Sequence, residues 1–127
     1  MIALVCLALN VYFEARSESV IAQFAVAQVT MNRVRSDLYP DSVCDVVWDT
    51  RQFSWTHDGK SDKPKEKAAW ERAQWVAKIT LEDNDNSISV VPHDTVHYHA
   101  DYVKPYWITG CVRITQIGRH IFYRRKL

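Results

Sequence analysis

Residues 10–19 read Asn-Val-Tyr-Phe-Glu-Ala-Arg-Ser-Glu-Ser, and they join two helical patterns. An apolar helix is expected over residues 2–15. Ser17 and Ser19 can cap a second helix, which is expected over residues 20–35. One stripe of the first helix is formed by Leu4, Leu7, Val11 and Glu14.

Glu14 is surrounded by rings and alkyl groups in the run Tyr12-Phe13-Glu14-Ala15. A carboxyl in such surroundings is poorly hydrated when it is ionised, so its pKa rises and it can hold a proton near neutral pH. Cleavage of a glycosidic bond needs a proton donor of this kind for the leaving oxygen. The alternative is a solvated carboxylate at a helix end, paired with Arg16 or Arg33, because most carboxylates are surface charges. The rest of the chain favours the proton donor.

The composition is that of an ordinary globular protein. The 127 residues are 47% hydrophobic and 24% charged, and a chain of this length suits one compact domain, expected over residues 1–127. Sixteen basic and 15 acidic residues give a net charge of +1. This balance leaves no electrostatic footprint for nucleic acid, so no nucleic-acid partner is expected.

The apolar beginning, residues 1–13, invites interpretation as a signal peptide. It has no basic leading segment, and Asn10 interrupts an apolar run that is already short. The run is also too short to span a bilayer. We therefore expect no signal peptide and no stable membrane insertion, and we expect this segment to belong to the folded domain.

The pattern changes from helical to extended about two-thirds of the way along the chain. Helices first and strands later predict an α+β fold, mainly helical in the N-terminal two-thirds, with a small antiparallel sheet in the C-terminal third. Asp41 or Ser42 can cap a short helix through Val43, Val46 and Val47. The other expected segments are a polar loop at 57–63, a helix over 64–81, strands at 88–91 and 95–98, and a hairpin of 112–115 and 120–123 that turns at Gly118.

Three cysteines, Cys6, Cys44 and Cys111, are spaced too widely for a disulfide-rich scaffold or a paired zinc motif. One disulfide with a free thiol and three reduced thiols both fit this spacing. Cys6 and Cys44 lie in apolar helical patterns, where buried free cysteine is common. The pairing stays open at this point.

Two segments combine rings with polar groups, as a sugar-binding groove requires. Gln52-Phe53-Ser54-Trp55 presents an amide, two rings and a hydroxyl, which can bind sugar substituents and stack on sugar faces. The second segment, residues 97–107, contains Tyr98, His99 and Tyr106. For both segments the alternative is a packed structural loop.

His97 and His99 raise the question of a metal site. Two histidines at i and i+2 on a strand point to the same side and could share a zinc ion, with His93 upstream. No third ligand has a convincing spacing, and the chain contains no HExxH motif. We therefore favour a strand with an aromatic and polar face along the groove, and we expect no metal and no cofactor.

Seven runs of the chain resemble the spore-cortex-lytic (SleB-type) cell wall hydrolases. The runs occur in the same order and span nearly the whole sequence, which makes a chance match improbable. They are residues 10–18, 25–34, 39–44, 52–55, 97–100, 103–107 and 117–123.

The resemblance implies a lysozyme-like fold that cleaves the glycan strands of bacterial peptidoglycan. The catalytic acid of this family is the glutamate of the Glu-Ala-Arg run, which is Glu14 here. The family pattern has Gly before the next glutamate, where this chain has Ser17. Many relatives carry a cysteine just after Phe-Ser-Trp, where this chain has His57, and this argues against a disulfide from Cys44 to that loop.

The resemblance further implies a lytic transglycosylase, and we expect the protein to be a monomer. Glu14 would protonate the oxygen between N-acetylmuramic acid and N-acetylglucosamine. It would then accept the proton of the muramic acid 6-hydroxyl as that group attacks the anomeric carbon, which gives a 1,6-anhydro product. The residues implied in substrate binding are Glu18, Gln52, Phe53, Ser54, Trp55, Tyr98, His99 and Tyr106.

Glu18 is the nearest candidate for a second carboxylate. Ser17 and Ser19 indicate that the helix breaks there. We therefore expect Glu18 to orient a neighbour such as Arg33 or to help cap the second helix.

Other functions remain open at this stage. One is hydrolysis by a muramidase on the same fold, another is a zinc-dependent N-acetylmuramoyl-L-alanine amidase using His97 and His99, and a third is a wall-binding module without activity. A short lytic domain without an export signal fits a phage endolysin, which would stay in the host cytoplasm and reach the cell wall or periplasm through a holin.

Overall fold

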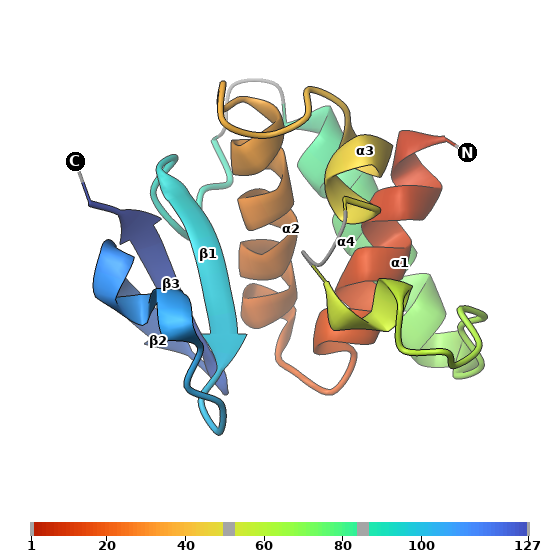
Figure 1. Ribbon diagram of the computed structural model, residues 1–127. Coiled ribbons are helices and arrows are strands. Elements are labelled where there is room, and N and C mark those ends of the chain that lie inside the picture. Colours follow the sequence, from red (N-terminus) through yellow and green to blue (C-terminus); the bar gives the residue numbers. More distant parts are fainter. Residues whose placement is uncertain (1, 50–52, 84–86, 127) are drawn as a thin grey trace.

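The computed structural model describes residues 2–49, 53–83 and 87–126. Figure 1 shows α2 lying between the sheet on one side and the other helices on the opposite side. The helices are α1 (Ala3–Ala15), α2 (Val20–Val34), α3 (Val43–Val47) and α4 (Lys67–Glu82), and the 3-10 helices are η1 (Ser54–Thr56) and η2 (Tyr106–Gly110). The strands are β1 (Thr95–Ala100), β2 (Cys111–Ile117) and β3 (His120–Arg125).

The predicted α+β layout is confirmed, and two of the predicted caps begin their helices. Ser19 Oγ accepts a hydrogen bond from the backbone of Ala22 at 3.2 Å, which caps α2. Ser42 rather than Asp41 caps α3, through the backbone N–H of Asp45 at 3.2 Å. Side-chain oxygens at these positions satisfy N–H groups that a helix leaves unpaired at its start.

α1 belongs to the core of the domain, as expected for residues 2–15. Leu7 and Val11 on α1 are fully buried and pack in one cluster with Val76 of α4 and Val47 of α3. A second cluster joins α2 to the sheet around Phe122 of β3. Within the described residues, no helix is both long and apolar enough to cross a membrane.

The three cysteines form one disulfide and leave one free thiol. Cys6 of α1 and Cys44 of α3 are bonded, while Cys111 at the start of β2 is free. The bond joins the first helix to a helix of only 5 residues. Cys44 thus pairs with α1 and not with the loop that contains His57.

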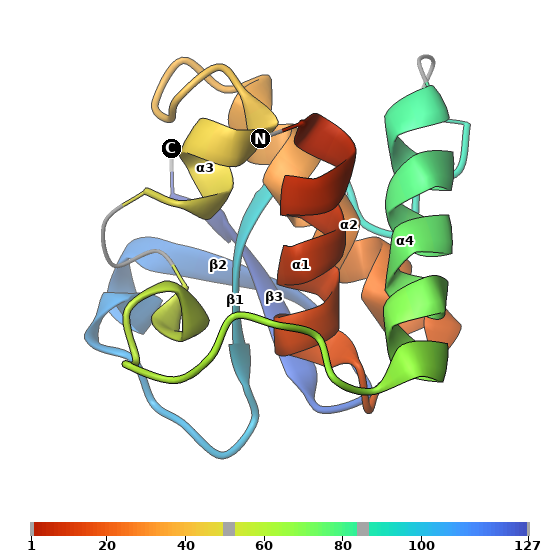
Figure 2. The same cartoon turned by 90° about the vertical axis from the view of Figure 1, so that its right-hand side faces the viewer.

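The segment between η1 and α4 crosses the C-terminal end of α1, as Figure 2 shows. Tyr12 Oη holds it there by accepting hydrogen bonds from the backbone of Lys65 at 3.1 Å and of Glu66 at 3.0 Å. Arg16 Nε adds an ion pair with the Glu66 carboxylate at 2.6 Å. The loop predicted at 57–63 is confirmed, and α4 begins three residues later than Pro64.

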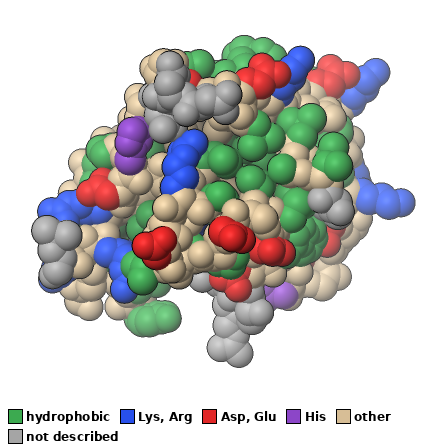
Figure 3. Space-filling view, turned by 90° about the horizontal axis from the view of Figure 1, so that it is seen from above, with side chains coloured by type: hydrophobic (Ala, Val, Ile, Leu, Met, Phe, Trp, Pro, Cys, Tyr) green, Lys and Arg blue, Asp and Glu red, His purple; other side chains and the backbone are tan. Residues whose placement is uncertain are grey.

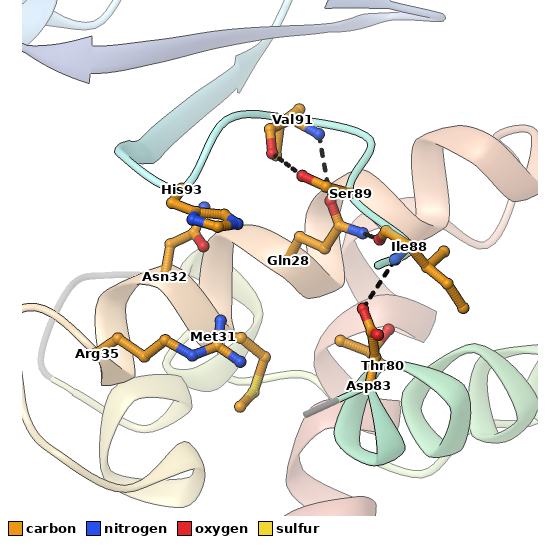
Figure 4. Close-up of a pocket in the computed structure, with 10 residues that line it drawn as sticks. All are labelled: Gln28, Met31, Asn32, Arg35, Thr80, Asp83, Ile88, Ser89, Val91 and His93. Carbon is orange, nitrogen blue, oxygen red and sulfur yellow. Dashed lines mark hydrogen bonds between the residues drawn. The ribbon is translucent and has the colours of Figure 1, made fainter. Parts of the chain in front are cut away.

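The prediction of a strand at 88–91 is wrong. The Gln28 side chain on α2 takes the place of a neighbouring strand: its Oε1 accepts from the backbone of Val90 at 2.7 Å and of Val91 at 3.2 Å, and its Nε2 donates to the Ile88 carbonyl. Asp83 accepts from the Ile88 backbone at 3.1 Å. Figure 4 shows the bonds of Ile88 and Val91 around a small pocket. Because a side chain satisfies these backbone groups, the segment stays irregular despite its β-branched residues.

The sheet is antiparallel, in the order β1-β3-β2, so that β1 forms one edge. The predicted hairpin turns at Gly118, whose φ is +58°. A Cβ at this position would lie 2.8 Å from Glu18 Oε1, the same atom that accepts a hydrogen bond from Arg119 N at 2.7 Å. The β2–β3 turn is therefore fastened to the segment between α1 and α2.

Gly118→Ala is expected to destabilise the domain by about 1–2 kcal/mol, because a Cβ disfavours positive φ and displaces Glu18. Thermal unfolding should show a midpoint lower by roughly 3–8 °C. Gly110→Ala is the matched control, because a Cβ there meets nothing within 4 Å. Equal midpoints for the two variants would contradict this account of the turn.

The face seen from above in Figure 1, where α1 begins and α2 ends, carries an area of apolar side chains next to scattered charged ones (Figure 3). More than half of a typical folded surface is apolar. This area therefore indicates no binding partner by itself.

Candidate active site

Glu14 lies in the last turn of α1, and Tyr98 of β1 points at it. Tyr98 Oη donates a hydrogen bond to Glu14 Oε1 at 2.7 Å. The two residues are 84 positions apart in the chain, and the packing of α2 between α1 and the sheet brings them together. One carboxyl oxygen is thus held by a phenol.

Burial is the main influence on the Glu14 carboxyl and raises its pKa above the usual value. The hydrogen bond from Tyr98 and the positive charge of Arg33 act in the opposite direction and lower that pKa. The net direction is upward, which favours a carboxyl that holds its proton at a higher pH than a solvated one. Burial also raises the pKa of Tyr98 well above its usual value, and the negative charge of Glu14 adds to this, so the phenol remains a donor.

Arg33 of α2 provides a buried positive charge beside this pair. Its Nε donates to the Val96 carbonyl at 2.8 Å. Its guanidinium carbon lies 5.1 Å from the centre of the Phe53 ring and 5.3 Å from that of Tyr39, distances that suit cation–π attraction. Arg33 acts on Glu14 through its charge rather than as the surface ion-pair partner of the alternative interpretation.

Asn10 of α1 hydrogen-bonds to residues of η1 and α2, and sequence reasoning missed this role. The side chain is fully buried. Its Oδ1 accepts from Trp55 Nε1 at 2.8 Å, and its Nδ2 donates to Thr30 Oγ1 at 3.4 Å. An amide that interrupts an apolar helical run was the available signal, since a buried polar group must find partners.

A cavity of about 590 Å³ opens over Glu14. Among the described residues that line it, Glu14 carries the one carboxylate. Sequence reasoning did not assign His57 or His120 to this place. The other polar or aromatic side chains that the cavity brings together include Phe13, Ser54, His57, Tyr98, His99 and His120.

The rings of Phe53 and Trp55 differ from the expectation that they stack on sugars. Both are buried, with exposed fractions of 3% and 5%. Trp55 stacks on Phe13 at a centroid distance of 4.9 Å, and Phe53 packs on Tyr98 at 6.3 Å. These rings support the side chains that line the cavity.

The remaining predicted binding residues divide between two places. Ser54, Tyr98 and His99 line the Glu14 cavity, whereas Tyr106 lines a neighbouring cavity that also has Tyr98 in its lining. The prediction for Gln52 lies outside the described residues.

Glu18 has a different place from the one expected. Its carboxylate holds the β2–β3 turn and lies 3.4 Å from His120 Nδ1, while Arg33 binds the carbonyl of β1. Its backbone carbonyl accepts from Gln23 Nε2 at 3.2 Å. Glu18 therefore reaches the cavity through His120, not through Arg33.

His97 and His99 are occupied by other groups. His99 Nδ1 lies 2.7 Å from the Ala100 carbonyl and its Nε2 lies 2.8 Å from Tyr123 Oη. His97 Nε2 lies 3.2 Å from Tyr39 Oη. Across the described part of the chain, no three His, Cys, Asp or Glu side chains gather as a metal site would require.

Tyr98→Phe is expected to shift the alkaline limb of the pH–rate profile to higher pH. The hydrogen bond from Tyr98 lowers the pKa of Glu14, so its loss lets burial raise that pKa further, and the acid form persists to a higher pH. Initial rates on suspended peptidoglycan across pH 4–9 measure the limb. Tyr102→Phe, an exposed ring at the same cavity, should leave the limb in place, and a downward shift in Tyr98→Phe would contradict the assignment.

Comparison with known sequences gives the family. The sequence model described as Cell Wall Hydrolase matches residues 17–123. The chain belongs to the cell wall hydrolase family. The match begins three residues after Glu14, so it does not itself include that glutamate.

Curated relatives of this cell wall hydrolase are spore cortex-lytic enzymes. That of Oceanobacillus iheyensis is 33% identical over 112 residues, which are 88% of this chain and 38% of the relative. That of Bacillus subtilis is 32% identical over 116 residues, which are 91% of this chain and 35% of the relative. The chain thus spans less than two-fifths of the length of these relatives.

Solved structures of two catalytic domains match the fold of this cell wall hydrolase. The catalytic domain of the germination-specific lytic transglycosylase SleB from Bacillus anthracis superposes with a TM-score of 0.76 at 28% identity, covering 96% of this chain and 93% of that one. The catalytic domain of SleB from Bacillus cereus gives a TM-score of 0.70, covering 96% and 90%. The expected lysozyme-like fold is confirmed, and the similarity extends through α1, beyond the residues that the family model matches.

Proposed function

We propose that this domain is a lytic transglycosylase that cleaves the glycan strands of peptidoglycan between N-acetylmuramic acid and N-acetylglucosamine. Peptidoglycan is consistent with membership of the cell wall hydrolase family. The observation that carries the proposal is Glu14. It is a half-buried carboxyl with a raised pKa, held by Tyr98, and the one carboxylate among the described residues lining its cavity.

The first step is protonation of the leaving oxygen. Glu14 in its acid form gives its proton to the glycosidic oxygen, while the bond from that oxygen to the muramic acid anomeric carbon breaks. The raised pKa keeps the proton available. Tyr98 stabilises the carboxylate that forms, because its hydroxyl remains a donor.

The second step returns the proton. The Glu14 carboxylate accepts the proton of the muramic acid 6-hydroxyl as that oxygen bonds to the anomeric carbon, which closes a 1,6-anhydro ring and restores the acid. No water is consumed. A hydrolase of the common two-carboxylate kind would place a second carboxyl roughly 5–9 Å away, and the described lining of the cavity offers none.

We further propose that the domain works as a monomer, because one chain supplies both Glu14 and the Tyr98 hydroxyl that holds it. The amidase alternative is not supported: His99 is hydrogen-bonded at both ring nitrogens, and His97 faces Tyr39.

The products distinguish the reactions. Muropeptides released from purified sacculi should be lighter by one water than hydrolysed ones, and borohydride should leave them unreduced, because a 1,6-anhydro end has no free aldehyde. Reducible muramic acid ends would support a muramidase, and release of free stem peptides would support an amidase. Binding to sacculi without soluble products would indicate a wall-binding module.

A further inference from the structure

A second cavity adjoins the Glu14 cavity, with Tyr98 lining both. Its volume is about 360 Å³, within the range of pockets that bind small ligands. Its lining comes from α2, the edge strand β1, the ends of β2 and β3, and η2, which contributes Tyr106 and Trp107. A chain-like ligand bound over Glu14 can therefore reach the second cavity at Tyr98.

Two arginines give the second cavity a positive charge. Arg33 and Arg125 both line it, and none of the described residues in its lining is acidic. Arg33 is buried, and its positive charge already interacts with the negative charges of Glu14 and Asp49. Arg125 at the end of β3 is exposed and can reach a ligand. Burial first, and then the charges of both arginines, lower the pKa of His97 to about 4, so this histidine stays neutral and adds no third charge.

Aromatic rings form the other wall. Trp107 stacks on His97 with centroids 5.0 Å apart and meets the edge of Tyr123 at 5.4 Å, which fixes its position. Tyr106 has an exposed fraction of 94% and lines the same cavity. Rings held at a cavity mouth suit contact with a sugar face, while a guanidinium group suits a carboxylate.

The substrate of the proposed function supplies such a carboxylate. N-acetylmuramic acid differs from N-acetylglucosamine by a lactyl ether, whose carboxyl is either free or joined to a stem peptide that carries carboxylates of its own. We propose that the second cavity is a subsite in which Arg125 binds a carboxylate carried by a muramoyl residue, so that the enzyme selects strands with anionic substituents. This inference rests on the proposed function and adds the chemical feature of the substrate that is recognised.

The test varies the carboxylate and the arginine together. Sacculi are used intact, or after removal of the stem peptides by an amidase, which leaves free lactyl carboxylates. Part of each preparation is treated with carbodiimide and methylamine, which converts carboxylates to neutral amides. Initial rates of fragment release at limiting substrate are measured for the wild type, Arg125→Gln and Arg125→Lys. Arg124→Gln, which removes the same charge at the adjacent position and does not line the cavity, is the matched control.

Blocking the carboxylates should slow the wild type roughly fivefold, the size expected for a partly exposed charge pair. Arg125→Gln should show the same loss on unblocked sacculi and no further loss on blocked ones. Arg125→Lys should recover part of the rate, and Arg124→Gln should follow the wild type. If the effect of blocking disappears once the peptides are removed, the carboxylate belongs to the stem; if it persists, the lactyl group is recognised.

Two results would overturn the subsite while leaving the proposed function in place. One is a wild-type rate that does not change on blocking; the other is an Arg125→Gln loss that is equal on blocked and unblocked sacculi. Failure of the proposed function looks different, since the wild type would then release no anhydro products from any preparation, and the subsite would fall with it. Sedimentation with sacculi measures binding without turnover when Glu14→Gln is used, alone or combined with Arg125→Gln. The combined variant should bind roughly fivefold more weakly than Glu14→Gln alone.

Discussion

The Glu14→Gln variant is expected to release glycan fragments from sacculi at least about 1,000-fold more slowly than the wild type. The amide keeps the shape of the side chain and can still accept the hydrogen bond from Tyr98 Oη, but it has no proton to give and cannot take one back. Both steps of the proposed reaction depend on that proton. Release of soluble muropeptides, followed by chromatography, measures the loss.

The matched control for this variant is Glu18→Gln. Its amide oxygen can still accept from Arg119 N, so the β2–β3 turn should hold and the rate should fall much less. Comparable losses in Glu14→Gln and Glu18→Gln would mean that the effect is structural and would contradict the assignment of Glu14.

The stability of Glu14→Gln gives an independent readout. Burial raises the pKa of Glu14, so the folded state binds this proton more tightly than the unfolded state does. The stability linked to this group is therefore fully present below its unfolded pKa of 4.5 and is lost as pH rises through the raised folded pKa. Glutamine does not ionise, so the variant should melt at a higher temperature than the wild type at pH 8, with a smaller difference at pH 4.

Replacing both Cys6 and Cys44 by alanine is expected to cost about 4 kcal/mol of unfolding free energy. The bond closes a loop between residues 38 positions apart, and the loss of that constraint lets the unfolded chain gain entropy. Urea or thermal unfolding without reductant should show this as a fall in the midpoint on the order of 15 °C.

Cys111→Ser controls for the loss of a thiol, since Cys111 is free and only partly buried. Its unfolding free energy should stay within about 1 kcal/mol of the wild type. A double alanine variant as stable as Cys111→Ser would contradict a structural role for the disulfide. Reductant should lower the stability of the wild type and leave the double variant unchanged.

The sequence predicts the helices well because their signals are local. Ser19 and Ser42 act as caps, and the apolar composition of α1 and α2 matches their burial on nearly every side. The hairpin at Gly118 is local in the same sense, since a turn residue lies between two short extended runs. The strand predicted at 88–91 fails because its backbone partner is a side chain, Gln28, some 60 residues away, and periodicity carries no information on such a contact.

The site, like the fold, is predicted from the sequence only in part. The apolar neighbours of Glu14 predict its raised pKa, and the family resemblance points to Tyr98 before any contact is known. The way in which α1, α2 and β1 pack together determines that Phe53 and Trp55 are buried. It also determines that Asn10 hydrogen-bonds to Trp55. The chemical types of the side chains identify residues that matter for the site. Whether a ring lines the cavity or supports its wall depends on the three-dimensional packing.

The central claim is that a lone carboxyl gives and takes back one proton without the use of water. Digestion of sacculi in water enriched in oxygen-18 tests this directly, because hydrolysis adds one solvent oxygen to each new muramic acid end. Mass spectrometry of the released fragments should find 1,6-anhydro ends with no heavy oxygen. Reducing ends that carry oxygen-18 as the main product would contradict the claim and make the domain a hydrolase.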